Sequence, residues 1–210
     1  MIKVLYGTYN RAKIEHMRTL LGDTCFDIIC LDDVDARMMP DINENGNSPL
    51  ENACIKARAY FKAYNRPVFS CDSGLYLEGV EEDRQPGVHV RRVKNKTLSD
   101  DEMIDYYSKL VKEHGGQIVA QYINAICFIV DENHTYTYDG KDIASVPFLL
   151  VSNPHHLRKS GFPLDSLSKD MQSGKYFFDK PPETGYHVSD KGFQDFFTHA
   201  MMDYRLKHVH

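Results

Sequence analysis

One segment near the start of the chain has the residue types and spacing that suit an anion. Thr8, Asn10 and Lys13 follow a short apolar run and open a stretch with helical periodicity. The backbone N–H groups and the dipole at a helix N-terminus attract anions, and a lysine one turn further on adds positive charge. The segment is not a P-loop, because it lacks G-x-x-x-x-G-K-[ST]. It favours an anion-binding turn, and the alternative is a capped helix with a solvated lysine.

A second segment joins a polar loop to a helix. Glu44 lies in a loop rich in Asp, Asn, Pro and Gly, whereas Glu51 and Lys56 lie on the predicted helix that follows. A loop carboxylate close to a phosphate site is a candidate Mg²⁺ ligand, since Mg²⁺ prefers oxygen ligands together with substrate phosphates. Glu51 is explained more simply, as a carboxylate that interacts favourably with the helix dipole.

A third segment places a carboxylate at the end of a predicted buried strand. Asp72 is followed by Ser73 and Gly74, and α/β sheets bind ligands at the carboxyl ends of their strands. The glycine is expected to permit a sharp turn and a close approach of substrate. Asp72 is therefore a candidate to hold a metal or to take a proton from water. The alternative is an Asx-turn that caps the strand.

The elements that must position these groups follow from hydrophobic periodicity. A β-α-β beginning and later strands joined by hairpin-like turns predict one α/β domain over 1–210, with an elongated, mixed, twisted sheet flanked by helices. The predicted strands are 2–6, 26–31, 67–72 with a continuation after a kink at 75–77, 118–130, 134–138 and 146–151, and the predicted helices are 11–21, 50–64, 100–114 and 191–206.

Composition limits the class of protein. The chain has 210 residues, of which 42% are hydrophobic and 26% charged, with a net charge of −5, which is typical of a soluble globular protein. Neither a membrane nor a nucleic-acid partner is expected, because there is no long apolar run and the charge is acidic. The five cysteines lack C-x-x-C spacing, so we expect reduced thiols in the cytoplasm.

Taken together, the segments resemble a known family. The motifs G-T-x-N-x-x-K-x-E, E-x-G-x-S-x-x-E-N-A-x-x-K-A, D-S-G-L and P-G-V followed by Arg92 are similar in order and interval to those of the inosine triphosphate pyrophosphatase-like family. Its members hydrolyse noncanonical purine nucleoside triphosphates. The resemblance is clear through Arg92 and looser beyond it. It implies two lobes with a central nucleotide cleft, a Mg²⁺ cofactor and a homodimer.

The resemblance also implies roles for individual residues. Asp72 matches the catalytic aspartate, which also binds metal, and Glu44 matches the metal-binding glutamate. Phe162 matches the aromatic residue that stacks on the base, and Asp165 the aspartate of the same loop. The remaining expected substrate contacts are Thr8, Asn10, Lys13, Lys56 and Ser73, together with the base-reading segment Ser189, Asp190 and Lys191.

The chain departs from the family pattern at three places. Cys71 stands where a second Asp is usual, Pro163-Leu164 stands in the aromatic loop where Gly-Tyr is usual, and Ser189-Asp190-Lys191 replaces Ser-His-Arg. An ionised aspartate only accepts hydrogen bonds, so it would repel the base carbonyl that His and Arg donors suit. We therefore expect a shifted base preference, with guanine fitting the Asp/Lys pair and adenine as the other candidate.

The predicted function is hydrolysis of a nucleoside triphosphate, most simply a purine, to the monophosphate and pyrophosphate. Two alternatives stay open. One is a hydrolase of the same fold that acts on another phosphoanhydride with relaxed base reading. The other is a nucleotide-binding protein without turnover, against which the retention of Glu44, Lys56 and Asp72 argues.

Overall fold

The computed structural model describes residues 1–22, 24–93, 96–180 and 190–208. Its contacts group the chain into two compact units. The first comprises 1–73, 124–143 and 189–210, and the second comprises 74–123 and 144–188. The prediction of a single domain over 1–210 remains a prediction.

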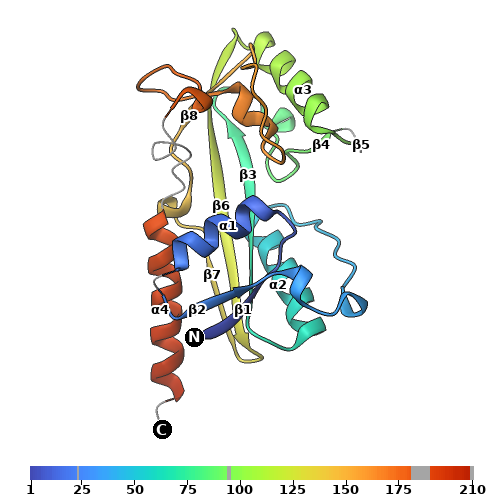
Figure 1. Cartoon of the computed structure of the whole chain (residues 1–210). Helices are drawn as coiled ribbons and strands as arrows, with labels where there is room; N and C mark the ends of the chain where they lie inside the picture. Colours follow the sequence, from blue (N-terminus) through green and yellow to red (C-terminus); the bar gives the residue numbers. More distant parts are fainter. Residues whose placement is uncertain (23, 94–95, 181–189, 209–210) are drawn as a thin grey trace. The chain divides into compact units, whose positions relative to one another are not determined.

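The first unit begins with a β-α-β arrangement (Figure 1). Strand β1 pairs in parallel with β2 and with β3, and the sheet order is β2-β1-β3-β6, with β7 antiparallel to β6. The elements are β1 (Ile2–Tyr6), α1 (Arg11–Leu21), β2 (Phe26–Ile29), α2 (Pro49–Tyr64), β3 (Val68–Leu77), β6 (Gln117–Asp131), β7 (His134–Tyr138) and α4 (Asp190–His208).

This strand order creates a switch point between β1 and β3. The chain leaves β1 toward β2 and then returns across β1 to reach β3. Because such crossovers are right-handed, their helices lie on opposite faces of the sheet, and α/β sheets bind ligands in the crevice at such a switch point, here where β1 ends beside β3. Strand β1 ends at Tyr6, which pairs with Phe69. Asp72 therefore lies on β3 beyond the end of β1, at this crevice.

The turn expected at Ser73-Gly74 is wrong, because β3 runs without interruption from Val68 to Leu77. Leu75 both donates to and accepts from Gly87 through backbone hydrogen bonds of 2.9 and 3.0 Å. These bonds keep the backbone extended past the glycine. Asp72 thus sits within a strand and not at its end.

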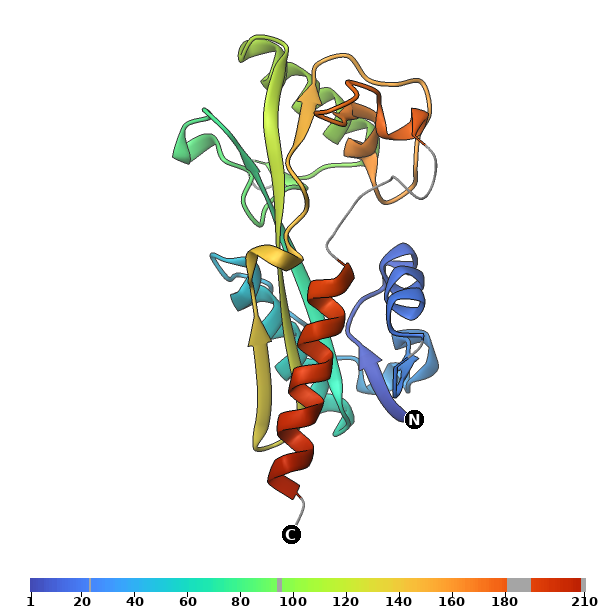
Figure 2. The ribbon, with the colours of Figure 1, turned by 90° about the vertical axis from the view of Figure 1, so that its left-hand side faces the viewer.

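The two faces of the first sheet carry different cores. Helix α2 covers the face that includes Leu5, Val68, Cys127 and Ile129. Helix α4 covers the other face, as the turned view shows (Figure 2), where Phe197 contacts the rings of Phe26, Phe69 and Phe128. Alternation along β3 then directs Asp72 toward α2, like Val68, and Cys71 toward the opposite face.

The second unit contains a helix packed on short strands. Helix α3 (Asp100–Glu113) begins at a capping box between Ser99 and Glu102. Strand β8 (Phe148–Val151) pairs antiparallel with both β6 and β9 (Ser168–Lys169). Other short elements are β4 (Arg92–Val93), β5 (Lys96–Thr97) and the 3-10 turn η5 (Pro163–Leu167). The α/β class with a mixed sheet flanked by helices is confirmed.

None of the helices in the described part of the chain is long and apolar enough to cross a membrane.

Candidate active site

The turn after β1 is shaped by a glycine and two side-chain oxygens. A Cβ on Gly7 would lie 2.3 Å from Ser70 Oγ and 2.5 Å from Tyr60 Cδ2, so only glycine fits. Thr8 Oγ1 accepts from the Asn10 N–H at 3.2 Å, and Asn10 Oδ1 accepts from the Lys13 N–H at 3.2 Å. Asn10 is therefore the N-cap of α1, which starts at the β1/β3 crevice.

The loop that carries Glu44 is tied to the start of α2. The Gly46 N–H donates to Asn52 Oδ1 at 2.8 Å, and the Asn47 N–H donates to Glu51 Oε2 at 2.7 Å. Asn52 is buried, and a Cβ on Gly46 would lie 2.7 Å from Glu51 Cβ. The motif E-x-G-x-S-x-x-E-N thus fixes the loop that presents Glu44, a structural role for Asn52 that sequence analysis did not assign.

Three charged groups from distant parts of the chain meet at the crevice. Lys56 Nζ lies 2.9 Å from Glu44 Oε2 and 2.8 Å from Asp72 Oδ1. The side chains of Lys56 and Asp72 are only 13% and 15% exposed. Burial acts to lower the pKa of Lys56, but the attraction of Asp72 and Glu44 outweighs it and raises that pKa above its usual value. Lys56 is therefore a stably charged bridge between two carboxylates.

Lys13 faces the same cluster from α1. Burial, and then the like charge of Lys56, lower the pKa of Lys13, while Cys71, Asp72 and Glu44 act in the opposite direction. Burial also raises the pKa of the Cys71 thiol to about 11. Cys71 is consequently a neutral group where a carboxylate would have favoured a charged Lys13 more strongly.

The lowered pKa of Lys13 carries a stability prediction. In the folded protein the charged form is disfavoured, so keeping the proton at pH 7 costs stability, and the cost fades as pH rises through the folded pKa. Lys13→Met keeps the apolar stem, and we expect it to raise the unfolding temperature at pH 7 by roughly 2–4 °C. Thermal unfolding without ligand measures this, with Lys3→Met, an exposed lysine of β1, as control. A lower unfolding temperature for Lys13→Met alone would refute the electrostatic cost.

The predicted base-reading residues begin α4 in the first unit. Asp190 Oδ1 lies 3.3 Å from Nε2 of His16, which follows Lys13 by one turn of α1. Lys191 is exposed. Ser189 lies outside the described residues. Helix α1 therefore connects the turn after β1 to Asp190.

Phe162 and Asp165 belong to the second unit and form a cluster with a lysine. Lys159 Nζ lies 4.5 Å from the centroid of the Phe162 ring and 3.4 Å from Asp165 Oδ2. Burial raises the pKa of Asp165, and Lys159 opposes this. Sequence analysis did not single out Lys159, because no motif in the sequence marks it. The first unit brings together Thr8, Asn10, Lys13, Glu44, Lys56, Asp72 and Ser73, with Asp190 and Lys191 on α4, and the second holds Phe162 and Asp165.

Few side chains at this site could act as ligands of a metal ion. Within the described ranges, no group of three or more His, Cys, Asp or Glu side chains gathers in a way that could hold a metal ion. Glu44 and Asp72 nevertheless converge on one cationic nitrogen. Two carboxylates that share a cation suit an ion that completes its shell with water and substrate phosphates, as Mg²⁺ does. The residues therefore fit a substrate-dependent metal site.

The proteins that this chain resembles point to one family. The family model of the Ham1 family matches residues 4–143. A dITP/XTP pyrophosphatase of Malacoplasma penetrans is 29% identical over 147 residues, which cover 67% of this chain and 70% of that protein. A dITP/XTP pyrophosphatase of Methylococcus capsulatus is 27% identical over 191 residues, or 90% of each chain.

A solved structure supports the fold. The HAM1 protein from Coxiella burnetii superposes with a TM-score of 0.72 at 23% identity, covering 98% of this chain and 100% of that one. The sequence resemblance noted above is thereby confirmed. Because the family model spans well over half of the 210 residues, this chain belongs to the Ham1 family.

Proposed function

We propose that the protein hydrolyses purine nucleoside triphosphates, including those with deaminated bases, to the monophosphate and pyrophosphate. The observation that carries the proposal is the convergence of Glu44, Lys56 and Asp72 beside the turn that starts α1. The similarity to proteins named dITP/XTP pyrophosphatase supports the substrate class.

The triphosphate is assigned to the crevice where β1 ends beside β3. The N-terminus of α1, capped by Asn10, offers a partial positive charge, and Lys13 adds a full one. The lowered pKa of Lys13 reflects a positive charge that is partly desolvated next to Lys56. An anion bound here relieves that repulsion, so the site is prepared for negative charge.

A divalent cation, proposed as Mg²⁺, completes the site. Glu44 and Asp72 would hold it, and when bound it supplies neutralisation of the triphosphate charge. Lys56 now bridges these two carboxylates. With substrate bound, the Lys56 ammonium would donate its hydrogen bonds to a phosphate oxygen instead of to the carboxylates.

The chemical step follows from the same groups. Asp72 orients a water toward the α-phosphorus and accepts its proton, since a carboxylate within hydrogen-bond reach can act as general base. The bond that breaks is the one between the α-phosphorus and the bridging oxygen, which leaves with the pyrophosphate. Lys13 and Lys56 stabilise the negative charge that builds on this leaving group. Phe162 stacks on the base.

The proposal extends to the cellular setting. We assign the protein to the cytoplasm as a homodimer, on the basis of the family resemblance. Neither nucleic acid nor membrane is a proposed partner, because a net charge of −5 does not favour generic binding to phosphate backbones.

A substrate panel tests the proposed function. ITP, XTP, GTP and dATP are incubated with the protein and Mg²⁺, and pyrophosphate and orthophosphate are measured separately. We expect pyrophosphate and the monophosphate; orthophosphate as the sole product would contradict the proposal. Equal pyrophosphate release from every base would favour a general phosphoanhydride hydrolase. Nucleotide affinity without any product would indicate a binding protein.

The base-reading segment gives a separate prediction. Asp190 is exposed, and its Oδ1 lies 3.3 Å from His16 Nε2. An ionised carboxylate can accept a hydrogen bond from the 2-amino group of guanine, which hypoxanthine and xanthine lack. We expect Asp190→His to raise kcat/KM for ITP and XTP relative to GTP by about tenfold, since one hydrogen bond to a base is worth roughly that much. Asp195→His, further along the exposed face of α4, is the matched control. An unchanged ranking of the four nucleotides would remove Asp190 from base selection.

A further inference from the structure

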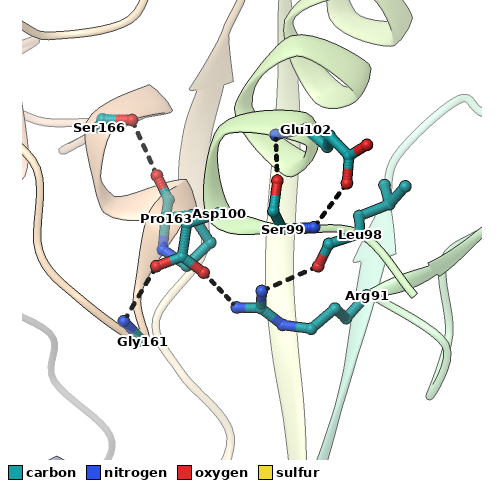
Figure 3. Close-up of polar contacts among 8 residues, drawn as sticks. All are labelled: Arg91, Leu98, Ser99, Asp100, Glu102, Gly161, Pro163 and Ser166. Carbon is teal, nitrogen blue, oxygen red and sulfur yellow. Dashed lines mark hydrogen bonds and ion pairs between the residues drawn. The ribbon is translucent and has the colours of Figure 1, made fainter.

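A hydrogen-bond chain in the second unit joins the start of α3 to the loop that carries Phe162 (Figure 3). Arg91 Nη2 donates to Asp100 Oδ1 at 2.7 Å, and Arg91 Nη1 donates to the carbonyl of Leu98 at 3.1 Å. The second carboxylate oxygen, Asp100 Oδ2, accepts from the Gly161 N–H at 3.3 Å. One carboxylate therefore connects two segments that are 61 residues apart in sequence.

The Gly161 contact comes at the point that sets the direction of the loop. Gly161 has φ of +80°, a left-handed conformation that favours glycine. Immediately after it, Phe162 is half-buried while Pro163 and Leu164 are buried. The end of the loop is fixed locally, because Ser166 Oγ donates to the Pro163 carbonyl at 2.8 Å. Its beginning is held by a local turn bond, from the Phe162 N–H to the Lys159 carbonyl at 3.0 Å, and from outside by Asp100.

The Arg91–Asp100 pair is poorly placed to serve the stability of the fold. Their side chains are 38% and 41% exposed, and exposed ion pairs contribute little to the free energy of unfolding. Helix α3 keeps its own cap at Ser99. What the pair does hold is an orientation, because Arg91, itself anchored on the Leu98 carbonyl, binds Asp100 through Oδ1 and leaves Oδ2 to accept from the Gly161 N–H.

We propose that Asp100, oriented by Arg91, is a positioning residue for base recognition: it holds residues 161–165, here called the stacking loop, so that the Phe162 ring is presented to the nucleobase. This rests on the proposed function, in which Phe162 stacks on the base. The pair affects the base through the position of Phe162, and it does not contact the groups of the first unit that are proposed to bind phosphate. Its loss should therefore weaken nucleotide binding without slowing the chemical step.

The experiment compares Asp100→Ala with Asp101→Ala, an exposed aspartate in the same first turn of α3. We expect Asp100→Ala to raise KM for ITP roughly fivefold, consistent with the net loss of about one ordinary hydrogen bond at an exposed position, with kcat unchanged. The inhibition constant of tripolyphosphate, which has no base, should stay the same. Asp100→Asn, which keeps one acceptor, should recover part of the loss, and Arg91→Ala combined with Asp100→Ala should add little.

Hydrogen exchange at the stacking loop separates this proposal from the proposed function. Asp100→Ala should increase exchange at the Gly161 amide, whereas Asp101→Ala should not. If the wild-type protein releases no pyrophosphate, the proposed function fails, and the nucleotide Kd replaces KM in the same comparison. Equal KM or Kd in the two variants, or unchanged exchange at Gly161, would overturn the positioning role. A parallel rise in the tripolyphosphate inhibition constant would overturn it as well, because the effect would not be confined to the base.

Discussion

Replacing Asp72 with Asn is expected to lower kcat for pyrophosphate release by at least about a thousandfold, because general bases contribute roughly 10²–10⁴-fold and the substitution also removes a ligand charge. Asn has the same shape but cannot take a proton from water. Asp72 lies 2.8 Å from Lys56 Nζ and is held within the continuous strand β3. The effect should therefore appear in the chemical step while the fold is retained. Initial rates under saturating substrate and Mg²⁺ measure it.

A matched control is available on another strand of the same sheet. Asp27 is exposed on β2, and Asp27→Asn changes the net charge by the same amount without touching the crevice. We expect it to retain wild-type kcat. If Asp72→Asn retained more than a tenth of the wild-type rate, with unchanged far-UV circular dichroism, the water-activating role of Asp72 would have to be abandoned.

Lys56→Met is expected to damage both activity and stability. Its ammonium bridges Glu44 and Asp72, so its removal leaves two carboxylates facing one another with less compensation. Breaking a buried pair costs about 3–5 kcal/mol, and the partial exposure of Glu44 reduces this to about 2 kcal/mol. The lost stabilisation of the leaving group should lower kcat about a hundredfold or more. Denaturant unfolding and steady-state rates test the two effects.

The pH dependence of this loss has a definite sign. The pKa of Lys56 is higher in the folded protein than its ordinary value of 10.5. The stability that its charge contributes is thus fully present below that value and is lost only as pH rises through the folded pKa. The stability difference between wild type and Lys56→Met should stay constant across neutral pH and narrow only in strong alkali. Lys62→Met, on the exposed side of α2, should show no such difference; a gap that closes near neutral pH would contradict the bridging role.

The elements around the site were predictable because their signals are local. Asn10 and Ser99 are capping residues before helical periodicity, and both cap helices in the structure. The alanines of α2 indicated its apolar face, and the predicted start at Leu50 lies one residue after the observed start at Pro49. The approximate course of β6 also followed from a long run of β-forming residues. Each of these signals lies within a few residues of the element that it predicts.

What could not be predicted depends on contacts between distant segments. Ser73-Gly74 reads as a turn, yet the pairing of Leu75 with Gly87 keeps β3 extended. The family resemblance implied a separate role for each of Glu44, Lys56 and Asp72 but no contact among them. The spacing of residues in a sequence does not give the distance between their side chains in the folded protein. Lys159 over Phe162 and the Asp100–Gly161 bond carry no motif at all. Packing of the second unit determines them.

The position of attack on the triphosphate tests the central claim most directly. The protein is allowed to hydrolyse ITP with Mg²⁺ in water enriched in ¹⁸O, and the label is located in the products by mass spectrometry. A water held by Asp72 against the α-phosphorus places the ¹⁸O in the monophosphate and leaves the pyrophosphate unlabelled. Label found in the pyrophosphate instead would mean attack at the β-phosphorus, and the assignment of Glu44, Lys56 and Asp72 to this reaction would then be incorrect.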